Sequence, residues 1–155
     1  MQIIEHDGGR LAGIADLFTD SVHELAAAYY DAAQRDAWAP RPPDPAHWRA
    51  RLAHGITLLA DENGVLLGFL VFDTNGYIDM LFTSPRAPRR GVAGALYREA
   101  EHRLRTRGVT VLTTDASLAA EPFFARHGFD LVERQRVERG GQWFDRALMR
   151  KSLTG

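Results

Sequence analysis

The segment Pro85–Leu96, PRAPRRGVAGAL, has the composition of a helix start that binds an anion. A helix usually begins with Ser, Thr, Asp or Asn, whose side-chain oxygen accepts a hydrogen bond from the first free amides. This helix opens instead with small or apolar residues, namely Gly91, Val92, Ala93, Gly94 and Ala95. Its first amides therefore lack a side-chain acceptor and keep their positive potential. A bound phosphate would match them, because small residues let it approach the backbone.

Three arginines, Arg86, Arg89 and Arg90, precede this helix start. They are unfavourable beside the positive end of a helix dipole, but they would help to hold a pyrophosphate or a ribose phosphate. The alternative is a water-solvated helix start in an arginine-rich chain. A P-loop is excluded because Gly91–Ala95 lacks the Gly-Lys-Ser/Thr ending. A dinucleotide fingerprint is excluded because the three glycines in register and an early strand-helix-strand unit are missing.

Hydrophobic patterning and turn residues place this helix between two strands. They predict strands over Gln2–Glu5, Ile56–Ala60, Val65–Asp73, Tyr77–Thr83, Val109–Thr114, Phe129–Glu138 and Trp143–Arg150. They predict helices over Leu11–Ala28, Pro45–Ala53, Gly91–Arg107 and Ala119–His127. The first helix has a candidate break at Thr19–Ser21. The proline-rich stretch Pro40–Pro45 is expected to be an extended loop that ends in a helix start capped by Asp44, and Tyr30–Asp44 as a whole is expected to be a loop.

The order of these elements predicts an α/β (α+β) fold in a single domain over residues 1–155. Tyr77–Thr83 and Val109–Thr114 flank a helix and are therefore expected to be parallel, with a right-handed crossover. The other strands follow one another closely enough to pair as hairpins. We expect a mixed, mainly antiparallel sheet of six to seven strands with a central parallel pair, flanked by about four helices.

Two motifs resemble those of the GNAT superfamily of N-acetyltransferases. LFTSPRAPRRGVAGALYREAE is similar to its acetyl-CoA-binding motif, in which a strand leads through a proline into Gln/Arg-x-x-Gly-x-Gly/Ala and a helix. DASLAAEPFFARHGF resembles its second signature, an alanine-rich helix ending in Gly-Phe. YIDMLF, PRRGVA and the tail QRVERGGQWFDRALMRKSL are similar to the YafP-like bacterial branch. The resemblance covers nearly the whole chain and implies a GNAT-like fold.

The resemblance also implies how acetyl-CoA would bind. The backbone of Leu81, Phe82 and Thr83 would hydrogen-bond the pantetheine arm as an added strand, and the amides across Arg89–Ala95 would cradle the pyrophosphate. The acetyl thioester would lie between Tyr77–Thr83 and Val109–Thr114, which splay apart in the family. Two positions depart from the pattern. Pro88 replaces the Gln/Arg of the first motif, so the contact of that side chain would have to come from Arg89 or Arg86. Phe124 replaces the tyrosine that often serves as general acid.

Acetyl transfer to an amine needs a base for the ammonium, donors for the oxyanion and an acid for the leaving thiolate. Asp79 is the predicted base, since the family often carries a carboxylate on this strand; strand alternation would place it on one face with Leu81 and Thr83. The alternative is a structural aspartate that pairs with a neighbouring loop or an arginine. The backbone N–H of Leu81 or Phe82 would meet the oxyanion.

Further candidates stay open beside Asp79. Asp115, expected where its strand ends, would bind the ammonium of the acceptor, act through water, or cap the next helix together with Ser117. For the acid, the candidates are Tyr77, His127 and water. Direct transfer is favoured over a covalent acyl-enzyme because the chain has no cysteine.

The predicted acceptor is an amine of a small molecule or peptide. Aromatic residues of the first half would line its pocket or pack in the core: Tyr29, Tyr30, Trp38 and Trp48. The net charge of -1 argues against a nucleic-acid partner. The six histidines lack metal-ligand spacing, so no metal is expected. With neither a signal-like start nor an apolar run of about 18 residues, we expect a cytoplasmic protein without a membrane partner, compatible with a homodimer.

A second function stays open. Pro88 and Phe124 are compatible with a non-catalytic coenzyme A-binding sensor or regulatory module that has lost turnover.

Overall fold

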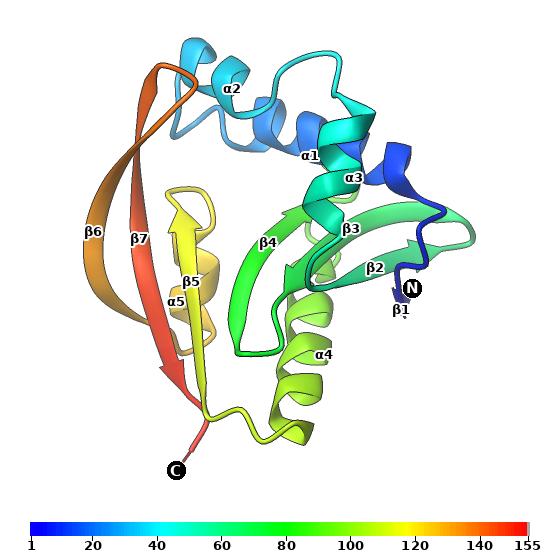
Figure 1. The fold of residues 1–155 in the computed structure, drawn as a ribbon, viewed down its shortest axis with the longest axis vertical. Helices are drawn as coiled ribbons and strands as arrows, with labels where there is room; N and C mark the ends of the chain where they lie inside the picture. The colour runs from blue at the N-terminus through cyan, green and yellow to red at the C-terminus, as the bar shows by residue number, and fades with distance from the viewer. Residues whose placement is uncertain (155) are drawn as a thin grey trace.

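A seven-stranded mixed sheet runs through the molecule (Figure 1). In the computed structural model, which describes residues 1–154, the strands lie in the order β1-β2-β3-β4-β5-β7-β6. Their bounds are β1 Gln2–Glu5, β2 Ile56–Glu62, β3 Val65–Phe72, β4 Tyr77–Thr83, β5 Val111–Ser117, β6 Asp130–Arg139 and β7 Gln142–Ser152. Neighbours pair antiparallel except β4 and β5, which are parallel. The predicted fold class and central parallel pair are confirmed.

Five helices occur within residues 1–154: α1 Leu11–Leu25, α2 Ala32–Trp38, α3 Pro45–Leu52, α4 Val92–Thr106 and α5 Glu121–Arg126. The sequence predicted about four, because α2 lies in the stretch expected to be a loop. A capping box starts this helix: the Asp31 side chain accepts from the Gln34 amide, and the Gln34 side chain accepts from the Asp31 amide. The candidate break in α1 is wrong, since the Thr19 hydroxyl donates to Ala15 O inside a continuous helix.

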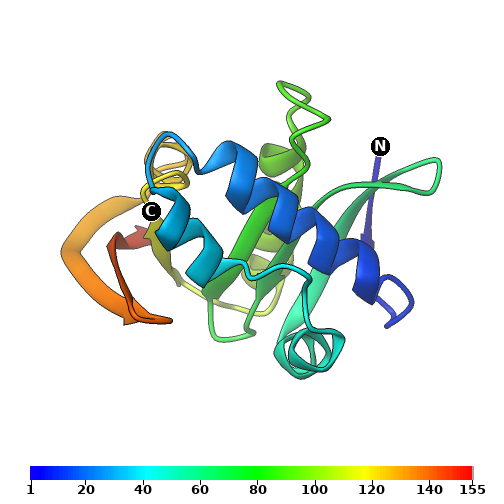
Figure 2. The same ribbon diagram turned by 90° about the horizontal axis from the view of Figure 1, so that it is seen from above.

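The helices bury both faces of the sheet. Side chains from α1 and α3 pack on one face, and side chains from α4 and α5 pack on the other (Figure 2). Successive side chains of a strand point to opposite faces of the sheet. Leu58 therefore packs in the hydrophobic cluster with the α4 residues (the α4 cluster), and its neighbour Leu59 packs in the cluster with the α1 residues (the α1 cluster). Leu96 and Leu104, two turns apart on α4, are fully buried. Each such side chain stabilises the fold by roughly 1.5–3 kcal/mol, which fixes α4 against the sheet.

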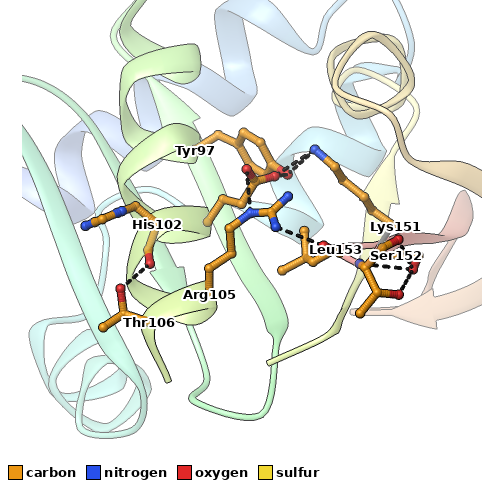
Figure 3. A network of polar contacts seen from close by, with 9 residues as sticks. Tyr97, His102, Arg105, Thr106, Lys151, Ser152 and Leu153 are labelled. Atoms are coloured by element: carbon orange, nitrogen blue, oxygen red, sulfur yellow. Dashed lines mark hydrogen bonds and ion pairs between the residues drawn. The ribbon is translucent and has the colours of Figure 1, made fainter. Parts of the chain in front are cut away.

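A polar network fastens α4 to the C-terminal end of β7 (Figure 3). Glu101 Oε1 accepts hydrogen bonds from Tyr97 Oη at 2.6 Å and from Lys151 Nζ at 2.7 Å. Arg105, one turn further along α4, donates to Leu153 O at 2.8 Å. Burial raises the pKa of Glu101, but the hydrogen bonds from Lys151 and Tyr97 outweigh it and lower the pKa to about 2. This carboxylate therefore stabilises the fold in its charged form.

The parallel strands β4 and β5 separate soon after they meet (Figure 1). Their register covers only Tyr77 with Thr113 and Ile78 with Thr114. The Thr114 hydroxyl donates to Ile78 O at 2.9 Å and closes the last contact. Beyond this point β5 follows β7, with which it stays paired as far as Ser117. The sheet is consequently open between β4 and β5 on the side towards which the two strands run.

The β5 boundaries differ from the prediction. The strand runs from Val111 to Ser117, because pairing with β7 holds its second half in extended form. Asp115 thus lies inside the strand, opposite Leu148, and does not end it.

Candidate active site

A cavity of about 570 Å³ fills the opening between β4 and β5. Its floor consists of consecutive residues from the two separating strands, Ile78–Phe82 of β4 and Thr114–Ser117 of β5. Side chains of α1, α2 and α3 close one side, and the β6–β7 hairpin closes another. Pocket walls built from several elements around a strand separation are typical of a ligand site.

Aromatic rings line one wall of the cavity. Phe18 lies 4.8 Å from Trp48 and 4.7 Å from Phe82 between ring centroids, with the rings edge to face. Trp38 and Tyr30 continue the wall, their centroids 5.6 Å apart. The sequence analysis expected these aromatic residues either to line a pocket or to pack in the core. Trp48 does both, since it lines the cavity and only 5% of its surface is exposed. Their packing makes the wall rigid.

Tyr29 and Tyr30 have different surroundings although they are adjacent. Tyr29 is exposed and does not line the cavity. The Tyr30 hydroxyl donates to Asp145 O at 2.7 Å and accepts from the Leu118 amide at 3.0 Å. It thereby bridges the end of β5 and the middle of β7, which keeps that edge of the cavity fixed.

Tyr77 and Asp115 meet at the point where β4 and β5 separate. The Tyr77 hydroxyl donates to Asp115 Oδ2 at 2.9 Å. Burial, together with the hydrogen bond and the charge of Asp115, raises the pKa of Tyr77 well above its ordinary value. The hydroxyl is therefore protonated throughout the neutral range. The guanidinium of Arg146 on β7 lies 3.9 Å from the same carboxylate oxygen.

Asp79 interrupts the alternation of β4. Val71 of β3 pairs with Met80 while the next residue, Phe72, pairs with Ile78, so Asp79 is the extra residue of a β-bulge. Ile78 packs in the α4 cluster and Met80 in the α1 cluster, whereas strict alternation would place them on one face. The regular alternation predicted for Tyr77–Thr83 is therefore wrong at this point, because a bulge redirects the side chains around it.

Asp79 lines the cavity beside Arg51 of α3. Arg51 NH2 donates to Asp79 Oδ1 at 3.2 Å. The sequence analysis left an arginine partner for Asp79 open without naming it; this partner is Arg51, which lies 28 positions earlier in the chain. Asp79, the predicted base, and Asp115, a candidate for binding the ammonium of the acceptor, line the same cavity.

Two other predicted candidates take structural positions. His127 Nδ1 lies 2.9 Å from Phe123 O, and its ring stacks on Phe123 at 4.1 Å, away from the cavity lining. Phe124 does line the cavity. Ser117 Oγ accepts from the Ala120 amide at 3.2 Å before α5 begins, which is the local contact considered for this serine.

The start of α4 is open. Gly91 adopts a left-handed conformation with φ +71°, no side chain caps the helix, and a Cβ built at Gly91 would meet no atom within 4 Å. The first main-chain bond of the helix joins the Ala95 amide to Gly91 O at 3.0 Å. The amides of Val92, Ala93 and Gly94 precede it, without a side-chain acceptor. These are the free donors that the sequence analysis expected there.

The three arginines at this helix start have different environments. Arg86 pairs with Asp20 at 3.1 Å, and Arg90 pairs with Glu62. Arg89, with φ +59°, has no carboxylate within ion-pair distance in the described residues 1–154. Two of the three guanidinium groups are therefore already neutralised, and Arg89 keeps its charge near the open amides.

The β4 backbone connects this helix start to the cavity. Leu81, Phe82 and Thr83 pair with β3 through one edge, and Leu81 and Phe82 also line the cavity. The other edge of β4 is without a partner strand beyond Ile78, since β5 has diverged. An extended ligand can add to such an edge as a further strand.

Three cavity-lining arginines were missed by the sequence analysis: Arg51, Arg139 and Arg146. They come from α3, β6 and β7, and only the register of the hairpin and the packing of α3 bring them together. No local pattern in the sequence marks them. Over residues 1–154, no cluster of three or more His, Asp or Glu side chains could hold a metal ion. Within the same range, none of the helices is long and apolar enough to span a membrane.

Comparisons with known proteins agree on one family. Residues 25–153 match the model of the acetyltransferase (GNAT) domain. The chain is 37% identical to the uncharacterized N-acetyltransferase YafP of Escherichia coli (strain K12) over 150 residues, covering 97% of this chain and 95% of YafP. A GCN5-related N-acetyltransferase from Rhodopseudomonas palustris superposes with a TM-score of 0.93 at 34% identity, covering 98% of this chain and 95% of the other. The fold is shared with PaiA N-acetyltransferase from Thermoplasma acidophilum, crystallised with coenzyme A, at a TM-score of 0.74, 17% identity and coverage of 98% and 99%.

Proposed function

This chain belongs to the GNAT family of acetyltransferases, and we propose that it transfers the acetyl group of acetyl-CoA directly to a primary amine of a small molecule or peptide. One observation carries the proposal. A cavity with two carboxylates on its floor, Asp79 and Asp115, opens at the β4–β5 separation and borders the free edge of β4, which leads towards the uncapped start of α4.

The residues of this chain fit acetyl-CoA. The free amides of Val92, Ala93 and Gly94 and the unpaired Arg89 form an electropositive surface for the pyrophosphate, with Gly91 leaving space for its approach. The pantetheine arm has the polar groups of a peptide, and it would add along the free edge of β4 at Leu81–Thr83. Relatives crystallised with coenzyme A or acetyl-CoA share this fold.

Acetyl-CoA supplies the reaction with an activated acetyl thioester, and the chain supplies the proton handling. Asp79 takes a proton from the ammonium of the acceptor and releases the nucleophilic amine. Asp115 attracts the same ammonium, and the Tyr77 hydroxyl holds its carboxylate in position. The N–C bond forms as the C–S bond breaks, with the carbonyl oxygen facing a main-chain N–H of Leu81 or Phe82.

The leaving thiolate needs a proton, and the geometry favours water as its source. Phe124 has no hydroxyl, and the His127 ring is held at Phe123 away from the cavity. The Tyr77 hydroxyl donates a hydrogen bond to Asp115, and the raised pKa of Tyr77 makes it a weak acid. The open cavity gives water access to the thiolate.

The alternative function is a coenzyme A-binding sensor or regulatory module without turnover. Two positions favour it: Phe124 has no hydroxyl, and Pro88 replaces the Gln/Arg of the acetyl-CoA-binding motif. The two carboxylates in the cavity favour the enzyme, because a coenzyme sensor has no need of acid/base groups beside the thioester.

Purified protein tests the proposal in two steps. Acetyl-CoA at 100 times its dissociation constant should stabilise the fold by about 2.7 kcal/mol, which raises the melting temperature by roughly 5–10 °C. Free thiol should then be released only when an acceptor amine is added. Thermal stabilisation without thiol release across a broad panel of primary amines would contradict the enzymatic proposal and support the sensor.

A further inference from the structure

Three guanidinium groups converge on one side of the cavity. Arg51 reaches it from the end of α3, Arg139 from the end of β6 and Arg146 from the middle of β7. Both Arg51 and Arg146 are close enough to Arg139 to act on it: partial burial of its guanidinium lowers the pKa of Arg139 foremost, and repulsion from Arg51 and Arg146 lowers it further. Arg139 is exposed to solvent as a whole residue while it lines the cavity, so a ligand can reach it, and the like charges around it favour an anionic ligand.

The carboxylates of the cavity compensate only part of this charge. Asp79 pairs with Arg51 at 3.2 Å, and Asp115 lies 3.9 Å from Arg146. The third carboxylate of the lining, Asp44, accepts from the Ala46 amide and caps α3. Among residues 1–154, Arg139 has no carboxylate within ion-pair distance; its guanidinium lies 5.8 Å from the centroid of the Phe144 ring.

The arginine cluster is separate from the proposed pyrophosphate surface. The lining of the cavity ends on β4 at Phe82 and includes none of the arginines at the start of α4. Arg51, Arg139 and Arg146 lie on α3 and the β6–β7 hairpin, whereas the arginines of the proposed pyrophosphate surface lie in the loop before α4. An anion at the cavity arginines is therefore a different group from the pyrophosphate, and we assign it to the acceptor.

We propose that Arg139, with Arg51 and Arg146 beside it, binds an anionic group of the acceptor, so that the preferred acceptor is a primary amine that also carries a carboxylate or phosphonate. The inference rests on the proposed acetyl transfer and adds the substrate class. The ammonium of such a zwitterion lies at Asp79 and Asp115, and its anion lies at the guanidinium of Arg139. The aromatic wall around Trp38 takes the remaining apolar part.

Other acceptor classes fit these charges less well. An amine with a neutral tail would leave Arg139 without a counter-charge. A polycationic amine would add repulsion to the cluster. A guanidinium binds carboxylate or phosphonate oxygens through paired N–H donors, which gives an anionic acceptor both charge and geometry.

Matched acceptors test the inference. Thiol release from acetyl-CoA is measured with a panel of L-amino acids, with the corresponding amino acid amides, and with aminoalkyl phosphonates. Each amide keeps the side chain of its amino acid and removes the negative charge; because the amide also makes the neighbouring amine less basic, kcat/KM is expressed per free amine in both series. We expect kcat/KM to be about 10- to 100-fold higher for the best anionic acceptor than for its neutral partner, and the ratio between carboxylate and phosphonate identifies the anion.

A variant assigns the preference to Arg139. Arg139→Gln should remove most of the anionic preference, lowering kcat/KM about 10- to 100-fold for the anionic acceptor and less than 3-fold for its amide. The control is Arg136→Gln, three residues earlier on the same strand, where Arg136 lies over the Trp143 ring and outside the cavity lining. It should leave both values unchanged. Thermal stabilisation by acetyl-CoA should be the same in all three proteins.

The outcomes separate the two proposals. Equal use of anionic and neutral amines, or equal losses for both in Arg139→Gln, would overturn the inference and leave acetyl transfer intact. If no amine releases thiol, the proposed acetyl transfer is wrong. The anion preference is then tested by measuring how the acceptors bind. With the protein saturated by coenzyme A, the amino acids should raise the melting temperature more than their amides do, and Arg139→Gln should abolish the difference. No difference in the wild-type protein would overturn the inference as well.

Discussion

The Tyr77 hydroxyl donates a 2.9 Å hydrogen bond to the Asp115 carboxylate and joins β4 to β5 beside the short stretch where the two strands pair. Beyond this contact the strands diverge around the cavity. The pair therefore fixes both the width of the opening and the direction of one of its carboxylates. We propose that Tyr77 acts through Asp115 and keeps its own proton.

Tyr77→Phe tests this role. Loss of one hydrogen bond to a charged group should lower kcat about 10-fold through misplacement of Asp115, with the KM for acetyl-CoA changed less than 2-fold. Because burial beside Asp115 raises the pKa of Tyr77, its hydroxyl stays protonated from pH 6 to about pH 10, and the alkaline side of the pH–rate profile should be unchanged. Loss of an alkaline ionisation in the variant would show instead that Tyr77 donates the proton.

Asp79→Asn tests the base. Removing the proton acceptor should reduce turnover by about 100-fold or more, while the affinity for acetyl-CoA, measured by calorimetry, should change less than 2-fold. Arg51, which loses its partner, is 42% exposed, so the fold should be little affected. Asp130→Asn on β6, an exposed aspartate outside the cavity lining, is the matched control. Undiminished turnover in Asp79→Asn would remove this residue from the mechanism.

Glu101→Gln tests the network between α4 and β7. Losing the charge-assisted bond from Lys151 should lower the free energy of unfolding by about 1–3 kcal/mol at pH 7. In the folded state the pKa of Glu101 is lowered to about 2, from about 4.5 in the unfolded chain, so its contribution is fully present above pH 4.5 and lost as the pH falls to 2. Urea unfolding at pH 7 and pH 3 measures the difference between variant and wild type, which should be smaller at pH 3. A constant difference would mean that the glutamate charge is not involved.

The sequence was sufficient for the family and for the central topology. The helix that starts at the Gly91 motif lies between two strands, and this order correctly predicts that the two strands are parallel. The comparisons confirm both the GNAT resemblance and its YafP-like branch. These features are local: a helix start without a cap, a glycine with positive φ, and β-branched strands. Local backbone preferences can be predicted from a short stretch of sequence.

Most of the parts that sequence reasoning missed depend on contacts between distant residues, and α2 is the exception. The capping box of Asp31 and Gln34 was a local signal for α2, but the prolines that follow favoured a loop. The bulge at Asp79 has no such signal, because it arises from the pairing of β4 with β3. The approach of Arg51 to Arg139 depends on how α3 packs against the sheet and on the hairpin register. Neither can be derived from spacing along the chain.

Substituting two glycines separately distinguishes a blocked coenzyme site at the start of α4 from the effect of backbone strain alone. Gly91 at its start and Gly108 beyond its end both have left-handed conformations, with φ +71° and +81°, and both have open space where a Cβ would lie. Leucine at either position should cost roughly 1–2 kcal/mol of folding free energy, since the strain is the same. Only the side chain at residue 91 would stand in the way of a phosphate.

Calorimetric titration of acetyl-CoA into the wild-type protein, Gly91→Leu and Gly108→Leu therefore tests the central claim most directly. We predict that the dissociation constant rises at least 10-fold in Gly91→Leu and less than 2-fold in Gly108→Leu. Equal affinity in all three proteins would contradict the placement of the pyrophosphate at the start of α4, and with it the account of how this chain binds its acetyl donor.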